Sequence, residues 1–243
     1  MRFKCTFKTE KIPIAYHMMF VSMIKEALKE EDEEYLNKLY FFGDKYNKKS
    51  KNFTFSVYLR DYKINGYEIK INDSVDLNIS SPDVEFMMKL YNGILKKKSF
   101  SYKKIYNMDK MRISMQPEKH ISKGKVCFKT LSPIFLKDKN GKSVSTESDE
   151  YSREFNYIQN KILENYRGYG LRENLEFIPV LMEKKVVKEE ISKFKKISGK
   201  DVYCVESYSG IFKLCGDVKD LNDIYMLGVG FRRSQGFGMI EVV

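Results

Sequence analysis

Apolar and polar residues alternate along much of the first half of the chain, a pattern typical of strands with one buried face. Such stretches run over residues 1–9, 52–61, 66–71, 74–81 and 106–116. Apolar residues recur at helical spacing in between. Residues 14–29 follow Pro13, and residues 81–97 open with Ser-Pro-Asp, so both predict helices. A second, shorter helix is predicted over residues 31–42.

The same succession of patterns begins again near Gly124. Strands are predicted over residues 124–138 and 175–183, within 191–216 and at 237–243, and helices over 145–170 and 217–227. Twice the order is strand, helix, strands, helix, strand, the split βαβ arrangement. We therefore predict an α+β fold of two tandem ferredoxin-like (RRM-like) domains, residues 1–123 and 124–243. No Pro- or Ser-rich linker separates them, so the two are expected to pack against each other.

The charge balance narrows the class of partner. The 243-residue chain has a formal net charge of +11 and a sequence pI of about 9.2, which suits a polyanion, with nucleic acid as the first candidate. Lysine far outnumbers arginine, so a basic protein from a lysine-rich, AT-rich genome is the competing explanation. Hydrophobic residues make up 42% of the chain, enough for a globular protein.

The N-terminus and the cysteines argue against several other classes. The first residues carry charge throughout and predict a strand rather than a signal peptide. No apolar run approaches the length of a membrane span, so we expect no membrane association and a cytoplasmic protein. Cys5, Cys127, Cys204 and Cys215 lie far apart and form no CxxC. They are expected to be reduced, mostly buried thiols rather than a disulfide framework or a zinc site.

A glycine-rich loop precedes the last predicted strand. It contains Gly228, Gly230, Arg232, Arg233, Ser234, Gln235, Gly236 and Gly238. A helix comes before this loop and a strand after it, which is the wrong order for a dinucleotide-binding turn, and a Walker lysine is missing. Accessible backbone N–H groups and two guanidinium groups would make a phosphate site. The alternative is a glycine-rich bend with a purely structural role.

The segment GVGFRRSQGFGMIEV (228–242) closely resembles the C-terminal glycine-rich loop of the CRISPR-associated repeat-RNA endoribonucleases, the sixth Cas protein family of the RAMP superfamily. Three further segments resemble that family in the same order: IPIAYHMMFVSMIKEAL (12–28), NFTFSVYL (52–59) and FKTLSPIFL (128–136). Together they extend over nearly the whole chain.

The resemblance implies a fold and a chemistry. The fold is two ferredoxin-like domains side by side. The activity is cleavage of precursor CRISPR RNA within each repeat, without a metal or other cofactor. The ribose 2′-OH attacks the adjacent phosphorus and leaves a 2′,3′-cyclic phosphate and a 5′-OH. The implied partner is CRISPR repeat RNA, both precursor and processed. Whether effector-complex proteins or a second copy of the chain also bind is left open.

In this family the catalytic residues lie around the first helical region, across the cleft from the glycine loop, and commonly include a histidine with a tyrosine or lysine. His17 is the first catalytic candidate, since imidazole titrates near neutrality; the alternative is a histidine packed among apolar neighbours. His120 lies in a polar stretch where a surface position is expected. Family histidines often stand near the end of the helical region, where this chain has Tyr40. Lys51 matches a position that is often lysine and could stabilise charge on a phosphorane.

Two stretches that mix basic and aromatic residues, 44–53 and 95–104, are further candidates for RNA contact. Lys48 and Lys49 in the first stretch, and Lys25 on the first helix, are the lysines predicted to bind RNA. Residues 183–196 mix both signs of charge and predict a solvated hairpin.

Three functions remain open at this point. The chain is a metal-independent endoribonuclease, a catalytically weak or inactive CRISPR-RNA-binding subunit, or an unrelated tandem RRM-like protein. The scarcity of histidine keeps the second open. The glycine-rich C-terminus argues against the third.

Overall fold

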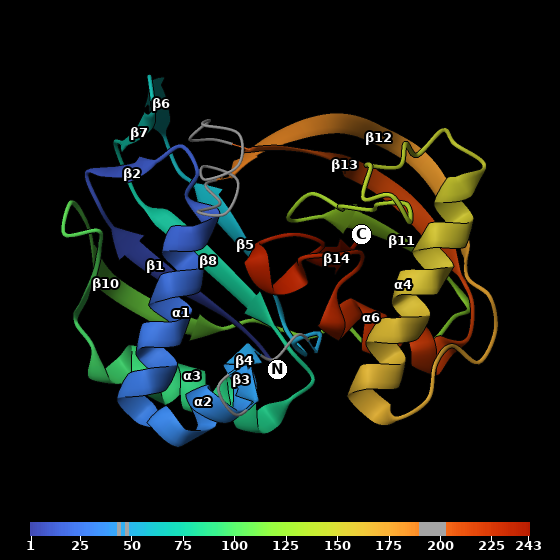
Figure 1. Cartoon of the computed structure of the whole chain (residues 1–243), viewed down its shortest axis with the longest axis horizontal. Helices are drawn as coiled ribbons and strands as arrows, with labels where there is room; N and C mark the ends of the chain where they lie inside the picture. The colour runs from blue at the N-terminus through green and yellow to red at the C-terminus, as the bar shows by residue number, and fades with distance from the viewer. Residues whose placement is uncertain (43–44, 47–48, 190–202) are drawn as a thin grey trace.

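The computed structural model describes residues 1–42, 45–46, 49–189 and 203–243 (Figure 1). Lys48, one of the lysines predicted to bind RNA, lies outside the described residues. The N-terminal half lies on the left of Figure 1 and the C-terminal half on the right, each with helices against a sheet. The glycine-rich loop that follows the last helix lies between them.

The N-terminal half contains a mixed α+β unit. Its sheet has the strand order β5-β8-β1-β10-β9. The strands are β1 (Arg2–Lys8), β5 (Thr54–Leu59), β8 (Val75–Ser80), β9 (Ser99–Tyr102) and β10 (Tyr106–Met115). The helices are α1 (His17–Glu31), α2 (Glu33–Tyr40) and α3 (Val84–Lys96). Short strands form two further sheets: β2 (Lys11–Pro13), β6 (Tyr62–Asn65) and β7 (Glu68–Ile71) in one, β3 (Phe41–Phe42) and β4 (Lys45–Tyr46) in the other.

The C-terminal half repeats this plan. Its sheet has the strand order β12-β13-β11-β14. The elements are β11 (Lys125–Thr130), α4 (Glu150–Arg167), β12 (Glu176–Glu189), β13 (Tyr203–Cys215), α6 (Val218–Leu227), the 3-10 turn η1 (Arg233–Gln235) and β14 (Ile240–Val242). In each sheet the first strand of the half lies between the third and the last, the ferredoxin-like order. The predicted fold class is therefore confirmed. The exact boundary at residues 123 and 124 stays a prediction.

Side-chain caps explain where several helices begin. Asp83 accepts a hydrogen bond from the N–H of Phe86 at 3.0 Å, which starts α3 directly after the predicted Ser-Pro-Asp. Asp217 does the same for α6, accepting from the N–H groups of Lys219 and Asp220. The first helix begins at His17 rather than at residue 14. The preceding residues form β2, and the N–H of Ile14 donates to the carbonyl of Tyr67 at 2.8 Å.

In the C-terminal half, one predicted strand is too long, and one predicted hairpin agrees with the structure over the described residues. The strand predicted over 124–138 ends at Thr130, because Leu131 and Ser132 donate their N–H groups to the carbonyl of Met239 instead of continuing the ladder. Within the segment 183–196, predicted as a solvated hairpin, the described residues 183–189 are the mostly exposed end of β12 and form one arm of the β12–β13 hairpin. This strand pairs with β13 in register from Glu176↔Cys215 to Glu189↔Tyr203. The rest of that segment lies outside the described residues.

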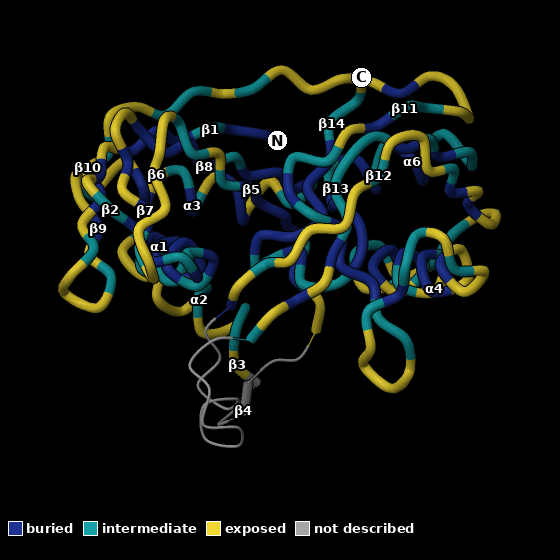
Figure 2. Tube along the Cα trace, turned by 90° about the horizontal axis from the view of Figure 1, so that it is seen from above, coloured by how far each residue is buried: buried dark blue, intermediate teal, exposed yellow. Residues whose placement is uncertain are grey.

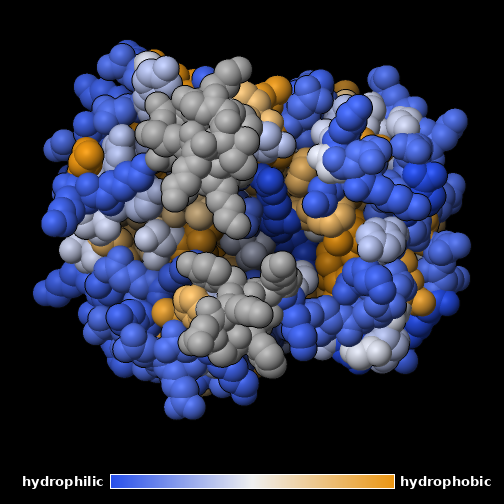
Figure 3. All heavy atoms as spheres, viewed as in Figure 1, coloured by the Kyte–Doolittle hydropathy of each residue, from blue (hydrophilic) through white to orange (hydrophobic). Residues whose placement is uncertain are grey.

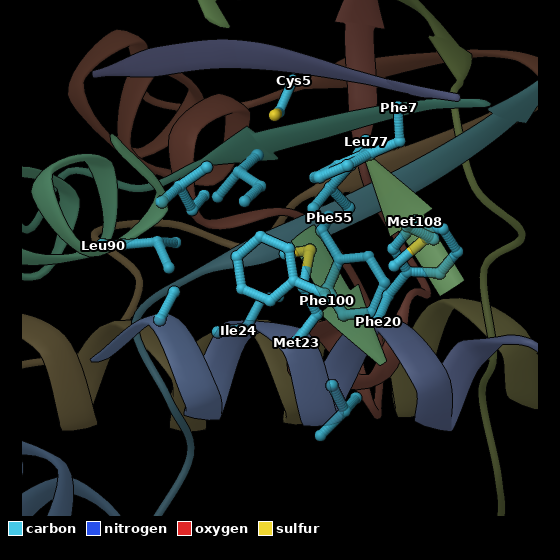
Figure 4. Packing of buried hydrophobic residues seen from close by; sticks show 14 of the residues in the cluster. Cys5, Phe7, Phe20, Met23, Ile24, Phe55, Leu77, Leu90, Phe100 and Met108 are labelled. Atoms are coloured by element: carbon cyan, nitrogen blue, oxygen red, sulfur yellow. The ribbon is translucent and has the colours of Figure 1, made fainter. Parts of the chain in front are cut away.

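Each half has its own hydrophobic core. Figure 4 shows Phe20, Met23 and Ile24 of α1 pointing toward the strand residues Phe55 and Leu77. The second core joins α4 and α6 to the other sheet. A third, small cluster consists of Phe135, Val205 and Phe237, and it packs the β12–β13 hairpin against the glycine-rich loop. All four cysteines are free, as predicted, but only Cys5 is buried and Cys204 is exposed.

Hydrogen bonds join the two halves at several points. Thr54 donates to the carbonyl of Phe237 at 2.9 Å, and Ser132 donates to the carbonyl of Phe55 at 3.2 Å. Arg2 on β1 donates to the carbonyl of Ile240 at 3.1 Å. Figure 2 shows buried segments within each half and also where the halves meet. The prediction that the halves pack against each other is therefore confirmed. Their packing places the glycine-rich loop beside β5.

The backbone geometry at the tip of the β9–β10 hairpin allows a prediction about stability. Lys103 and Lys104 both have positive φ, 52° and 58°, and the N–H of Ile105 closes the turn on the carbonyl of Tyr102 at 3.1 Å. This geometry favours Asn-Gly, because a Cβ disfavours the left-handed region. Lys103→Asn combined with Lys104→Gly is expected to raise the free energy of unfolding by about 1 kcal/mol in urea titrations. Lys123→Gly, at an exposed loop position, should give no gain; equal gains from both would contradict this explanation.

Candidate functional site

The glycines of the C-terminal loop allow close packing within the protein. Gly228 has φ of 79°, and a Cβ there would lie 2.9 Å from the side chain of Thr54 on β5. The N–H of Gly230 donates to the side-chain oxygen of Gln159 at 3.1 Å, and the N–H of Gly238 donates to the carbonyl of Pro133 at 2.8 Å. The structural alternative therefore accounts for these three glycines. Their predicted contact with RNA stays a prediction.

Arg233 anchors the loop to the N-terminal half. Its side chain is 3% exposed. The guanidinium donates to the carbonyl of Leu227 at 2.5 Å, to the hydroxyl of Ser50 at 2.6 Å and to the carbonyl of Lys51 at 3.1 Å. Burial lowers the pKa of Arg233 to about 9. In this placement Arg233 holds residues 50–51 against the loop. Its predicted contact with RNA stays a prediction.

Arg232 is the more accessible of the two arginines. It adopts left-handed backbone geometry, with φ of 58°, and its guanidinium carbon lies 5.1 Å from the ring centroid of Phe135. Its Nη1 lies 3.0 Å from the Oε2 of Glu189 at the end of β12. The side chain is about one quarter exposed, at 26%, so it can still meet a ligand.

His17 lies directly beneath the same loop. Its Nδ1 is 3.2 Å from the Oε1 of Glu189, and its ring meets that of Phe237 edge-on at 5.1 Å between centroids. A Cβ on Gly236 would come within 3.2 Å of the His17 ring. The imidazole is therefore fixed in orientation, but the residue is only 5% exposed.

A second cluster forms around Tyr40. The ammonium nitrogens of Lys25 and Lys51 lie 4.4 and 5.4 Å from its ring centroid. Burial lowers the pKa of Lys25, and burial together with the charge of Lys25 lowers the pKa of Lys51. Burial also raises the pKa of Tyr40, whose hydroxyl is buried with no hydrogen-bond partner in the described part of the chain. An anion placed here would favour the charged form of both amines and could accept a hydrogen bond from the hydroxyl.

A groove of about 500 Å³ connects this cluster to the glycine-rich loop. Its lining comes from α1, from the end of α2 and the segment before β5, from one residue of α4, and from the loop: Met18, Val21, Lys25, Tyr40, Lys49, Ser50, Lys51, Ile158, Gly230, Phe231, Arg232, Arg233, Ser234 and Gln235. Figure 3 shows a depression between the two halves with hydrophilic atoms in it. The structure thus brings together candidate residues that the sequence separates by up to about two hundred positions.

Three predicted regions lie outside this groove's lining. His17 does not line it, although its neighbours Met18 and Val21 on α1 do. His120 is exposed, in a segment that Lys119 ties to the carbonyl of Val242. In the basic stretch 95–104, Lys96 and Lys97 form ion pairs with Glu31 and Glu26 of α1. Those two pairs link α3 to α1, so their first effect is structural.

Glu189 is the site residue that sequence reasoning missed. It lies in the segment 183–196, whose mixed charges predict only a solvated hairpin. Its contacts with His17 and Arg232 join positions 172 and 43 residues away. No local pattern could have indicated such pairing.

Within the described residues, no group of three or more histidine, cysteine, aspartate or glutamate side chains is placed to hold a metal ion. In the same part of the chain, no helix is both long enough and apolar enough to span a membrane.

The sequence comparison decides the family. The family model described as CRISPR associated protein Cas6, C-terminal, matches residues 115–242, which is more than half of the chain. The chain belongs to the Cas6 family. No curated protein sequence matches it.

Solved structures of Cas6 and RAMP proteins have a fold similar to that of this Cas6-family chain. A structure described as a RAMP protein binding different RNA substrates has a TM-score of 0.81 at 18% identity, over 100% of this chain and 99% of the other. A Cas6-related protein from Pyrococcus furiosus gives 0.80 at 18% identity over the same shares. A Cas6 product complex gives 0.67 at 11% identity, again over 100% and 99%. At these identities the likeness establishes the fold alone.

Proposed function

We propose that this Cas6-family chain binds CRISPR repeat RNA in the groove between α1, residues 49–51 and the glycine-rich loop, and cleaves it there. The observation that carries the proposal is the convergence of Lys25, Lys51 and Arg232 on one groove. The Tyr40 hydroxyl beside them has no hydrogen-bond partner among the described residues. Such a group of cations suits an RNA phosphate and the charge that builds on it during cleavage. The structurally similar RAMP protein, which is described as binding different RNA substrates, supports the same substrate class.

The proposed reaction needs no metal. The 2′-oxygen of one ribose attacks the adjacent phosphorus in line, and its proton passes to a base. The bond from phosphorus to the 5′-oxygen breaks, and that oxygen takes up a proton from an acid. The products are a 2′,3′-cyclic phosphate and a 5′-OH. We assign proton transfer to His17, charge stabilisation to Lys51 with Lys25, and a hydrogen bond to a phosphate oxygen to Tyr40.

One observation favours a second candidate function. His17 is 5% exposed and already bonded to Glu189, so its imidazole is not open to the groove in this state. A chain that binds repeat RNA without cutting it, or cuts it slowly, would need the cations but not the histidine. The two candidates share the groove and differ in the chemistry. Association with effector proteins, formation of a homodimer and a cytoplasmic location stay predictions.

A cleavage assay in EDTA separates the candidates. A repeat RNA incubated with the protein is expected to give a single cut with a 2′,3′-cyclic phosphate, and a single 2′-deoxy substitution at the cut should abolish it. Tight binding without any cut would favour the binding subunit. A cut that persists in the deoxy RNA would contradict attack by the 2′-OH.

Removing charge from the groove is expected to weaken RNA binding. Lys25→Gln with Lys51→Gln should lower affinity by about tenfold at 0.1 M salt and reduce the salt slope by about 2. The matched control is Lys63→Gln with Lys70→Gln, an equal charge change at a cross-strand pair on the separate β6–β7 hairpin. Binding constants across a salt series check the prediction. Equal losses from both pairs would mean that only net charge matters.

A further inference from the structure

We infer that Glu189 is a positioning residue for RNA cleavage that acts through His17 and Arg232. The inference rests on the proposed function, since it assigns roles to both partners in the same reaction. Nothing in the sequence singles out this glutamate. Its importance comes from where the end of β12 is placed.

Glu189 is a buried carboxylate with both oxygens engaged. Its side chain is 1% exposed. Oε1 lies 3.2 Å from the Nδ1 of His17 on α1, and Oε2 lies 3.0 Å from the Nη1 of Arg232 on the glycine-rich loop. A charge this deeply buried is costly unless it is paired and hydrogen-bonded. Three elements that are distant in sequence are therefore held together at one carboxylate.

The contact with His17 fixes the state of the imidazole. A carboxylate oxygen only accepts hydrogen bonds, so a hydrogen bond across this contact requires a proton on Nδ1. In the neutral imidazole Nε2 then carries the lone pair, which is what the cleavage reaction requires of a base. The edge-on contact with Phe237 and the close approach of Gly236 hold the ring in that plane. A carboxylate behind an imidazole orients catalytic histidines in the same way in other enzymes.

The contact with Arg232 orders the cation at the groove. A guanidinium has five N–H donors, and the contact with Glu189 uses Nη1. The rings of Phe135 and Tyr203 lie 5.1 and 5.8 Å from its central carbon. The arginine is thus oriented before RNA arrives, so less conformational entropy is lost when a phosphate binds.

The first test of this inference is spectroscopic. Only His17 and His120 are present in the chain, so a His120→Asn background leaves a single imidazole signal. Nitrogen-15 shifts of folded wild-type protein in that background are expected to show the Nδ1–H tautomer of His17. Glu189→Gln should shift the population toward Nε2–H, because the amide can also donate, and Glu189→Asp should restore Nδ1–H. An Nε2–H tautomer with Glu189 intact would overturn the inference.

The second test is kinetic. Glu189→Gln is expected to slow single-turnover cleavage of repeat RNA by about ten- to a hundredfold while affinity falls less than about tenfold. Glu189→Asp should recover part of the rate. Glu183→Gln, an exposed glutamate on the same strand, is the control and should leave both unchanged. An unchanged rate and tautomer in Glu189→Gln would overturn the inference. If the wild-type protein does not cut repeat RNA, the proposed cleavage activity is wrong. The tautomer measurement then tests independently whether Glu189 positions His17.

Discussion

Replacing His17 by alanine is expected to slow cleavage of repeat RNA by about two to four decades, the usual contribution of a positioned general acid or base. The imidazole is held by Glu189 and Phe237 directly under the loop that is proposed to bind the RNA. Removing it leaves the cations of the groove in place, so RNA affinity should change far less than the rate. Single-turnover rates in EDTA, measured beside binding constants, check this prediction.

His120→Ala is the matched control for that experiment. The two histidines differ in placement, since His120 is exposed and lies outside the groove. Its loss should change neither cleavage nor affinity. A His17→Ala protein that is folded and cuts at the wild-type rate would move proton transfer to Tyr40 or Lys51. Unfolding curves of the variant are needed to exclude loss of the fold.

Replacing Arg233 by alanine is expected to lower the free energy of unfolding by about 3 kcal/mol. The change leaves two carbonyls and a hydroxyl without their donor and opens a cavity where the side chain was buried. The cost of burying the charge, visible in the lowered pKa of about 9, offsets part of the loss. Urea titrations monitored by circular dichroism measure the change.

Two further variants test whether the loss of stability in Arg233→Ala comes from the hydrogen bonds of the buried guanidinium. Arg233→Lys keeps the charge but cannot reach all three acceptors, so it should recover about half of the stability. Arg112→Ala, at an exposed arginine of β10, should cost about 0.5 kcal/mol or less. If Arg233→Ala is as mild as Arg112→Ala, Arg233 does not anchor the loop, and its predicted role as a direct RNA contact is favoured.

The fold could be predicted because its signals are local. Alternation over residues 1–9 and helical spacing over residues 81–97 each depend on one buried face, and the order of such elements repeats. The errors arose where distant contacts decide. Strand β11 ends at Thr130, earlier than predicted, because the next two backbone N–H groups both donate to the carbonyl of Met239, more than one hundred residues away.

The candidate site was predictable only in part for the same reason. The family resemblance named Tyr40 and Lys51 as candidates, and residue type and place in the chain named Lys25 and Arg232. The structure brings all four to one groove. Sequence could not distinguish Arg232 from Arg233, because their difference lies in what each guanidinium meets across the interface. The role of Glu189 could not be predicted from the sequence either, because both of its partners belong to other elements.

The most direct test of the account is where the scissile phosphate lies on the protein. A repeat RNA with a 2′-deoxy residue at the cut and 4-thiouridine beside it can be photo-crosslinked to the intact protein, and the attached peptides identified by mass spectrometry. The account predicts crosslinks to peptides that carry Tyr40, Lys51 or Gln235. Crosslinks confined to the β6–β7 hairpin or to α3, with none to the glycine-rich loop or residues 40–51, would contradict it.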